Sequence, residues 1–191
     1  MTGDPSTLLK LHLGCGKRFI PGFVHVDQVS FPHVDHVTDL RRLDMFGDGE
    51  ASLIYACQVI EYFDEFEVVP VLEEWRRVLA PGGVLRLSVP NFRTIASLYG
   101  AGLPLDWFLG TLYGRIPDGE GGFVYHRTTY DPPSLKRLLE QAGLVNPVEW
   151  DWRETEHADV DDFSQAYFPH MEKERGILFN LNMEARKPGV S

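Results

Sequence analysis

The sequence predicts an α/β fold built on a doubly wound, mostly parallel sheet. Short apolar runs alternate with helical segments along the chain, and apolar runs of this kind are typical of strands buried on both faces of a sheet. The first run leads directly into a Gly-x-Gly turn at 14–16. Glycine turns at the carboxyl ends of strands let a ligand approach bare backbone in doubly wound folds.

Five strands are predicted in the first half of the chain, each a short apolar run bounded by turn residues. They are Leu9–Leu13, Val24–Asp27, Val34–Val37, Ser52–Cys57 and Val84–Val89. The connection between the first two contains Pro21 and Gly22, which leave room for little more than one helical turn.

The clearest helix is predicted from about Glu67 to Leu79. Its apolar residues recur at spacings of three and four, and the run 81–83 (Pro-Gly-Gly) ends it. A second helix is predicted at Ser134–Ala142, with Gly143 as a left-handed cap. Two strand-like runs close the chain, Val145–Trp152 and Ile177–Arg186.

The glycine turn and the end of the second strand indicate the kind of ligand. A dinucleotide fingerprint needs a third glycine where this chain has Phe19, followed by a full helix to face a pyrophosphate. Both are missing here. Asp27 ends the second strand, and its carboxylate can accept two hydrogen bonds from a ribose diol. A ligand with hydroxyls and a positive centre therefore fits better than one with a diphosphate.

Several ordered motifs together resemble class I S-adenosylmethionine (SAM) dependent methyltransferases. They are Leu13-Gly14-Cys15-Gly16, the acidic strand end Asp27, Val37-Thr38-Asp39-Leu40, the run 55–62 and the turn 79–83. A weaker match to a His-x-x-x-Tyr-Asp pattern before a helix continues through Ala142. More narrowly, the chain resembles small bacterial methyltransferase-like proteins associated with glycan or secondary-metabolite pathways.

The resemblance implies a single domain over 1–191 with a seven-stranded Rossmann-like sheet whose last strand is antiparallel. It also implies SAM as cofactor. Gly14, Cys15 and Gly16 would pass under the methionine part, Asp27 would hold the ribose, and Asp39 with Leu40 would contact adenine. Gln58 would face the methionine end. The alternatives are that Asp27 caps a turn, that Asp39 is a helix N-cap, and that Gln58 is a solvated loop residue.

One motif departs from the pattern of this family. Many relatives carry His-x-x-Glu-His after the fourth strand, whereas this chain has Gln58-Val59-Ile60-Glu61-Tyr62, without either histidine. Glu61 is expected to be a structural hydrogen-bond acceptor at the buried start of a helix rather than a base.

A lid insertion is predicted at about 92–130, where aromatic residues mix with glycines. Aromatic faces suit sugar rings or flat acceptors, and they also face a sulfonium cation well; the alternative is that many of them only pack the insertion onto the sheet. His126 lies where this lid returns to the core and is the first choice for a general base. Its alternative role is to hold the loop in place, and His157 and His170 are the next candidates for the base.

Composition narrows the class of partner. The chain has 191 residues and a formal net charge of −10, which disfavours a broad contact with nucleic acid or an anionic membrane. Small-molecule substrates are expected, in a cytoplasmic protein without a signal peptide or a membrane span; the oligomeric state is unknown. Cys15 and Cys57 have no metal-ligand spacing and are expected to be small residues that line a pocket.

Five carboxylates and His157 gather in the tract 154–162. We expect a solvated surface there and no metal site, although a divalent metal that lowers the pKa of an acceptor hydroxyl is conceivable. An alternative is that Asp161, Asp162, Phe163, Ser164 and Tyr167 line the acceptor side of the pocket.

Three functional hypotheses follow. The first is a SAM-dependent methyltransferase that acts on a small molecule, such as a hydroxyl of a sugar or glycan precursor. The second is a nicotinamide-dependent oxidoreductase, which the missing third glycine disfavours. The third is a non-catalytic relative that binds a partner through its lid, which the loss of both histidines makes credible.

Overall fold

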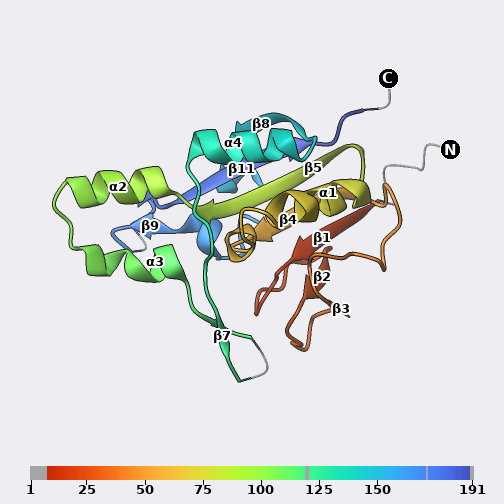
Figure 1. Cartoon of the computed structure of the whole chain (residues 1–191), viewed down its shortest axis with the longest axis horizontal. Helices are drawn as coiled ribbons and strands as arrows, with labels where there is room; N and C mark the ends of the chain where they lie inside the picture. The colour runs from red at the N-terminus through yellow and green to blue at the C-terminus, as the bar shows by residue number, and fades with distance from the viewer. Residues whose placement is uncertain (1–7, 119–120, 171, 190–191) are drawn as a thin grey trace.

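The computed structural model describes residues 8–118, 121–170 and 172–189, and a seven-stranded sheet forms its centre (Figure 1). The strand order is β3-β2-β1-β4-β5-β11-β8. The strands are β1 (Leu9–Leu13), β2 (Val24–Asp27), β3 (His36–Val37), β4 (Ala51–Cys57), β5 (Leu79–Pro90), β8 (Val145–Glu149) and β11 (Asn180–Arg186).

Strand direction confirms the predicted sheet. β1 to β5 pair in parallel, whereas β11 runs antiparallel to both of its neighbours, β5 and β8. The fold is therefore the mostly parallel, Rossmann-like α/β sheet that the sequence predicts, with its last strand antiparallel.

Several predicted bounds were wrong, for local reasons. β3 has only two residues because Val34 donates its amide to the carbonyl of Phe31 in a turn. β5 begins at Leu79, which pairs with Ala51 on β4, so the preceding helix ends one residue earlier than predicted. β8 stops at Glu149, before a 3₁₀ turn, η4 (Trp152–Glu154), that Asp151 caps.

The last predicted strand is divided in two. Its first residues form β10 (Ile177–Leu178), which pairs with β9 (Tyr167–Phe168) outside the main sheet. Between the two pieces, Phe179 donates its amide to the carbonyl of Ala166. Residues from Asn180 onward then join the main sheet as β11.

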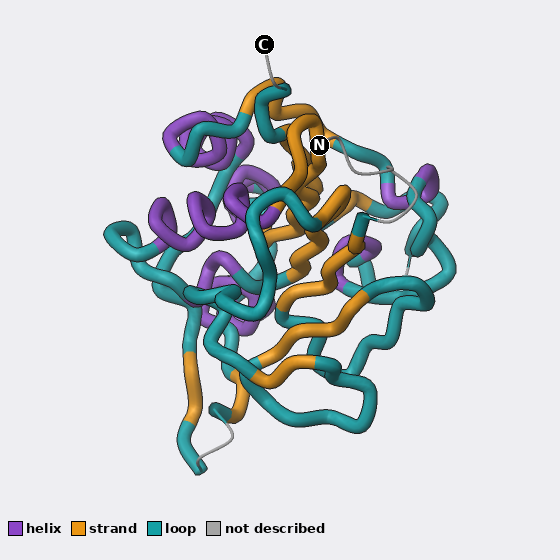
Figure 2. Tube along the Cα trace, turned by 90° about the vertical axis from the view of Figure 1, so that its right-hand side faces the viewer, coloured by secondary structure: helices purple, strands orange, loops and turns teal. Residues whose placement is uncertain are grey.

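Helices α1 (Val68–Val78) and α4 (Pro132–Gln141) pack on one face of the sheet. Helix α1 contributes Leu72 and Trp75, both fully buried against the apolar residues of β1, β4 and β5. α4 begins two residues before the predicted start because Asp131 caps it and prolines are tolerated in a first helical turn. In Figure 2 the long helices gather on this side of the sheet, and loops cover the other.

The second face is closed without a long helix. The β1–β2 connection contains only turns, in agreement with the short crossover predicted from Pro21 and Gly22. Its Ile20 and Phe23 instead pack against Leu53 and Tyr55 of β4, together with residues after β8. The C-terminal segment therefore covers part of this face, where no regular helix is formed.

The lid region holds more regular structure than the sequence predicts. It contains α2 (Phe92–Gly100), the 3₁₀ turn η3 (Leu105–Trp107) and α3 (Leu109–Tyr113), followed by the two-stranded β6 (Ile116–Pro117) and β7 (Phe123–Val124). Two further 3₁₀ turns are η2 (Ile60–Tyr62) and η5 (Phe163–Gln165). Within the described ranges, we find no helix with the length and apolar character needed to cross a membrane.

Candidate active site

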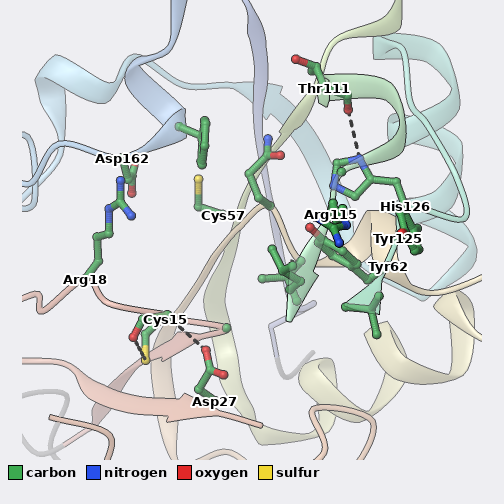
Figure 3. Close-up of a pocket in the computed structure, with 18 of the residues that line it drawn as sticks. Cys15, Arg18, Asp27, Cys57, Tyr62, Thr111, Arg115, Tyr125, His126 and Asp162 are labelled. Carbon is green, nitrogen blue, oxygen red and sulfur yellow. Dashed lines mark hydrogen bonds between the residues drawn. The ribbon is translucent and has the colours of Figure 1, made fainter. Parts of the chain in front are cut away.

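A cavity of about 1320 Å³ opens at the carboxyl ends of β1, β2 and β4. It is lined by every residue that the sequence analysis assigns to the site: Gly14, Cys15, Gly16, Asp27, Asp39, Leu40, Gln58 and His126. Figure 3 shows that Cys15 and Asp27 lie on one side of it, and that Tyr62, Arg115, Tyr125 and His126 gather on the other. The sheet thus brings together residues more than a hundred positions apart.

The glycine turn forms the floor of the cavity. Gly14 and Gly16 both have positive φ angles, 63° and 53°, which side chains rarely adopt. A Cβ at Gly14 would lie 2.4 Å from Cγ2 of Val59, whereas one at Gly16 would meet nothing within 4 Å. Gly14 is therefore required by close packing, and Gly16 leaves bare backbone open to a ligand.

Asp27 ties this turn to the end of β2. Its Oδ2 accepts a hydrogen bond from the amide of Gly16 at 2.7 Å, and its Oδ1 accepts one from the amide of Val29 at 2.8 Å. The side chain is buried at the cavity wall. Because each carboxylate oxygen can accept more than one hydrogen bond, Asp27 has capacity left for ligand hydroxyls while it fixes the loop.

Asp39 and Leu40 lie on the same wall. The Asp39 side chain is 57% exposed, and its Oδ1 accepts hydrogen bonds from the amide and the guanidinium of Arg41. Leu40 is buried, and its carbonyl accepts a hydrogen bond from Nε1 of Trp75 at 2.8 Å. Asp39 thus caps a turn, not the helix of the alternative interpretation, and it lines the cavity; its contact with adenine stays a prediction.

Gln58 is held in an unusual backbone conformation, with φ at 58°. Its amide donates to the carbonyl of Ser88 at 2.9 Å, but its side-chain nitrogen is buried and has no hydrogen-bond partner among the described residues. Strained backbone and an unsatisfied buried donor both cost free energy and are typical of functional sites. Gln58 is therefore not a solvated loop residue, and its side-chain nitrogen is available to donate a hydrogen bond to a ligand.

His126 is held on the lid side of the cavity. Its Nδ1 lies 3.0 Å from the carbonyl oxygen of Thr111, and the ring of Tyr62 meets it edge-on at 4.6 Å between centroids. Gly114 lies against the ring, since a Cβ there would be 2.4 Å from Nε2. Burial lowers the pKa of His126, which keeps the imidazole neutral, as a general base requires.

Glu61 lies behind His126, a proximity that sequence reasoning missed. Its Oε1 is 3.9 Å from Nε2 of His126, and its side chain is fully buried. We expected a structural hydrogen-bond acceptor, but neither carboxylate oxygen accepts a well-formed hydrogen bond from any described residue. Burial raises the pKa of Glu61 to about 8, opposed by the nearby amides of Glu61 and Val59.

Cys15 and Cys57 both line the cavity, as expected. Both are free. Burial raises the pKa of the Cys15 thiol to about 12, so this group is an inert part of the wall rather than a nucleophile.

The other histidines occupy different places. His170 lines the cavity, whereas His157 lies on the second face of the sheet, with its ring centroid 4.3 Å from that of Tyr55. Neither ring nitrogen of His157 has a hydrogen-bond partner among the described residues, and His157 does not line this cavity.

The carboxylates of the acidic tract 154–162 contact different partners. Glu156 pairs with Lys10 and Arg86, Asp161 pairs with Lys173, and Asp162 accepts a hydrogen bond from the Tyr55 hydroxyl at 2.6 Å. Across the part of the chain that the structure describes, no three acidic, histidine or cysteine side chains form a group suited to a metal ion. Asp162, Phe163 and Tyr167 do line the cavity.

The comparisons with known proteins agree on the fold. Residues 15–87 match the family described as "Methyltransferase domain". No protein of curated function matches the sequence significantly.

Solved structures of methyltransferases share the architecture at low sequence identity. A 1,6-didemethyltoxoflavin-N1-methyltransferase from Burkholderia thailandensis, solved with 1,6-didemethyltoxoflavin and S-adenosylhomocysteine, is 16% identical with a TM-score of 0.56; the match covers 94% of this chain and 71% of that chain. A SAM-dependent methyltransferase from Mesorhizobium loti is 15% identical with a TM-score of 0.52, covering 95% and 91%. Another from Thermotoga maritima is 12% identical with a TM-score of 0.59, covering 94% and 82%.

The matched domain and the shared architecture support an enzyme of the SAM-dependent methyltransferase type, with SAM as its cofactor. The residues that line the cavity fit that cofactor. Gly16 offers bare backbone, Asp27 offers a carboxylate for the ribose hydroxyls, and Gln58 offers an unpaired donor.

Proposed function

We propose that this enzyme transfers a methyl group from SAM to a small organic acceptor, with a hydroxyl as the favoured acceptor group. The single observation that carries this proposal is the convergence of the SAM-type residues and His126 on one cavity. The expected association with glycan or secondary-metabolite chemistry and the cytoplasmic location stay predictions, which an acceptor screen and cell fractionation test.

Cavity size supports a second ligand beside the cofactor. Pockets for one drug-sized ligand usually measure about 300–1,000 Å³, and this cavity measures about 1320 Å³. Several aromatic residues line the cavity, from the lid and from the C-terminal segment: Trp107, Phe123, Tyr125, Phe163 and Tyr167. Aromatic faces bind sugar rings and flat organic molecules by stacking.

On this proposal, the cofactor-side residues bind and orient. Asp27 holds the ribose hydroxyls while it keeps the glycine turn in place. Asp39 and the backbone of Leu40 border the adenine, and Gln58 donates to the methionine end. The bound cofactor supplies an electrophilic methyl group on a sulfonium, so the protein's main task is alignment.

On this proposal, His126 is the general base. With Nδ1 engaged by the Thr111 carbonyl, the lone pair of the neutral ring is on Nε2. Nε2 would take the proton of the acceptor hydroxyl, whose oxygen would displace the methyl group from the sulfonium and leave a neutral thioether. General base catalysis typically contributes about 100- to 10,000-fold to a rate.

Two measurements test the proposal. Mass spectrometry of ligands that co-purify with the protein should detect SAM or S-adenosylhomocysteine. A screen of nucleotide sugars and hydroxylated metabolites should then find an acceptor that gains the mass of one methylene, at a rate that falls at least about 100-fold in His126→Gln. An unchanged pH–rate profile in that variant would refute the base assignment, and SAM binding without turnover on any acceptor would favour the non-catalytic alternative.

An oxidoreductase is disfavoured by the same region. The β1–β2 connection forms only turns, so it offers no helix N-terminus to a pyrophosphate. Tight NADH binding without SAM binding would reverse this judgement.

A further inference from the structure

The Glu61 carboxyl group is an unexplained feature of this site. It is fully buried on η2, and neither of its oxygens has a hydrogen-bond partner among the described residues. Leaving a buried polar group unpaired costs about 1–3 kcal/mol. A group kept at this cost, beside a cavity that binds ligands, calls for a functional reason.

His126 is the basic group that Glu61 faces. The other titratable groups near Glu61 are Tyr62, Tyr130 and Cys57. All three are neutral near pH 7 because burial raises their pKa values, to about 12 for both tyrosines. An exchange of protons with Glu61 near neutral pH is therefore open to His126 alone among these neighbours.

Nearby cations do not neutralise Glu61. The Arg127 side chain pairs with Asp64 and Glu67. Arg115, which Figure 3 places near His126, stacks on the ring of Phe123 with its guanidinium 3.4 Å from the ring centroid. Neither arginine therefore compensates a negative charge on Glu61, and the protonation state of Glu61 depends on His126.

The backbone fixes the two side chains next to each other. The amides of Arg127 and Thr128 both donate to the main-chain carbonyl of Glu61, at 2.8 and 3.2 Å, so the residues that follow His126 are tied to Glu61. The Thr111 carbonyl holds the far side of the imidazole. A small side-chain rotation that shortens the present 3.9 Å separation by about 1 Å would make a hydrogen bond.

We propose that Glu61 is a positioning residue for the base: its carboxyl group and the His126 imidazole form a proton-sharing pair, and the charge on Glu61 sets the basicity of His126. This inference rests on the proposed function, because it gives Glu61 a part in the same reaction. Glu61 touches neither cofactor nor acceptor and acts through His126.

The proton balance of the pair follows from its geometry. At rest near neutral pH the pair holds one proton, on Glu61, because burial disfavours the charged form of both groups. When that proton is lost to solvent, Glu61 becomes an anion next to Nε2. His126 then takes the proton of the acceptor hydroxyl, and the resulting imidazolium is neutralised by the carboxylate. The rate should therefore rise with pH as the pair loses its resting proton.

The first experiment needs no acceptor. The ring signals of His126 are followed by NMR from pH 5 to 10 in the wild type, in Glu61→Gln and in Glu73→Gln. Glu73 is an exposed glutamate of α1, so the last variant makes the same substitution outside the buried pair. We expect an inflection near pH 8 in the wild type and the control, and its loss in Glu61→Gln. Below that inflection Glu61 is protonated and neutral, so the low-pH titration step of His126 should be similar in all three proteins. Identical titrations in all three proteins would overturn the proposal.

A second measurement applies once an acceptor is known. The turnover rate of Glu61→Gln should lose its rise through pH 8 and reach a plateau about tenfold lower, while its SAM affinity stays at the wild-type value. A purely structural role would lower stability and affinity without moving the pH profile, and that result would contradict the proposal.

Glu61→Gln is expected to fold, because the amide resembles the protonated acid. Should Glu61→Gln fail to bind SAM, the pair can be tested instead by replacing its other member, in His126→Gln. The pKa of Glu61, read from its carboxyl ¹³C signal, should fall in that variant because the imidazole that shares its proton is gone, and an unchanged pKa would overturn the pair. A wild-type protein that binds no SAM would instead refute the proposed function, so the two failures can be told apart.

Discussion

Replacing Gly14 by alanine tests how closely the glycine turn is packed. The new methyl group would meet two costs. The first is the positive φ angle of 63°, which costs an L-residue about 1–2 kcal/mol. The second is the 2.4 Å approach to Cγ2 of Val59, a buried side chain whose displacement costs about 1–3 kcal/mol. Gly14→Ala should therefore destabilise the protein by about 2–5 kcal/mol.

Gly16→Ala is the matched control. Its φ angle is similarly positive, at 53°, but its Cβ would meet nothing within 4 Å. Only the backbone cost of about 1–2 kcal/mol applies there. Since the two glycines share one turn, the difference between the variants isolates the contact with Val59.

Thermal unfolding without ligand measures this difference. For a chain of this size, 1 kcal/mol shifts the Tm by about 2–4 °C. Gly14→Ala should lower the Tm by about 4–20 °C, and Gly16→Ala by only about 2–8 °C. An equal loss in both variants would refute the packing argument.

Three other predictions concern stability and the base. Burial lowers the pKa of His12 to about 3, so between about pH 3 and 6.5 the unfolded chain binds a proton that the folded chain does not. The free energy of unfolding should therefore decrease as the pH falls below 6.5, by up to about 1.4 kcal/mol per pH unit. Urea unfolding should show a weaker pH dependence in His12→Gln, and an unchanged slope would contradict this. Gly114→Ala places a Cβ 2.4 Å from Nε2 of His126 and should slow turnover at least about tenfold with SAM affinity retained; wild-type turnover would count against the placement of the ring. Asp131→Ala removes the acceptor for the Ser134 amide in a capping box and should cost about 1 kcal/mol, measured by urea unfolding; no loss would show that the cap is dispensable.

Local patterns explain why much of the fold could be predicted. β1 and β2 have the predicted bounds because each is a short apolar run between turn residues. α1 follows the spacing of its apolar residues, and Asp131 marks the start of α4. The cofactor-type residues were predictable too, because carboxyl ends of parallel strands meet at one edge of a sheet. Gly14, Asp27 and Gln58 need only that rule to share a cavity.

What the sequence could not show depends on long-range packing. Glu61 precedes α1 and His126 lies near the end of the lid, so no spacing rule links them. The carbonyl of Glu61 accepts hydrogen bonds from the amides of Arg127 and Thr128 only in the folded chain. β5 begins earlier than predicted because Leu79 pairs with Ala51 of β4. The second face, where His12 and His157 pack around Tyr55, likewise has no local signal.

Calorimetric titration of the protein with SAM tests the central claim most directly. The wild type should bind SAM and S-adenosylhomocysteine with micromolar Kd values. Asp27→Ala should weaken binding by about 10- to 150-fold, because hydrogen bonds to a charged group contribute about 1.5–3 kcal/mol. Full-strength binding by Asp27→Ala, or no binding by the wild type, would contradict the account.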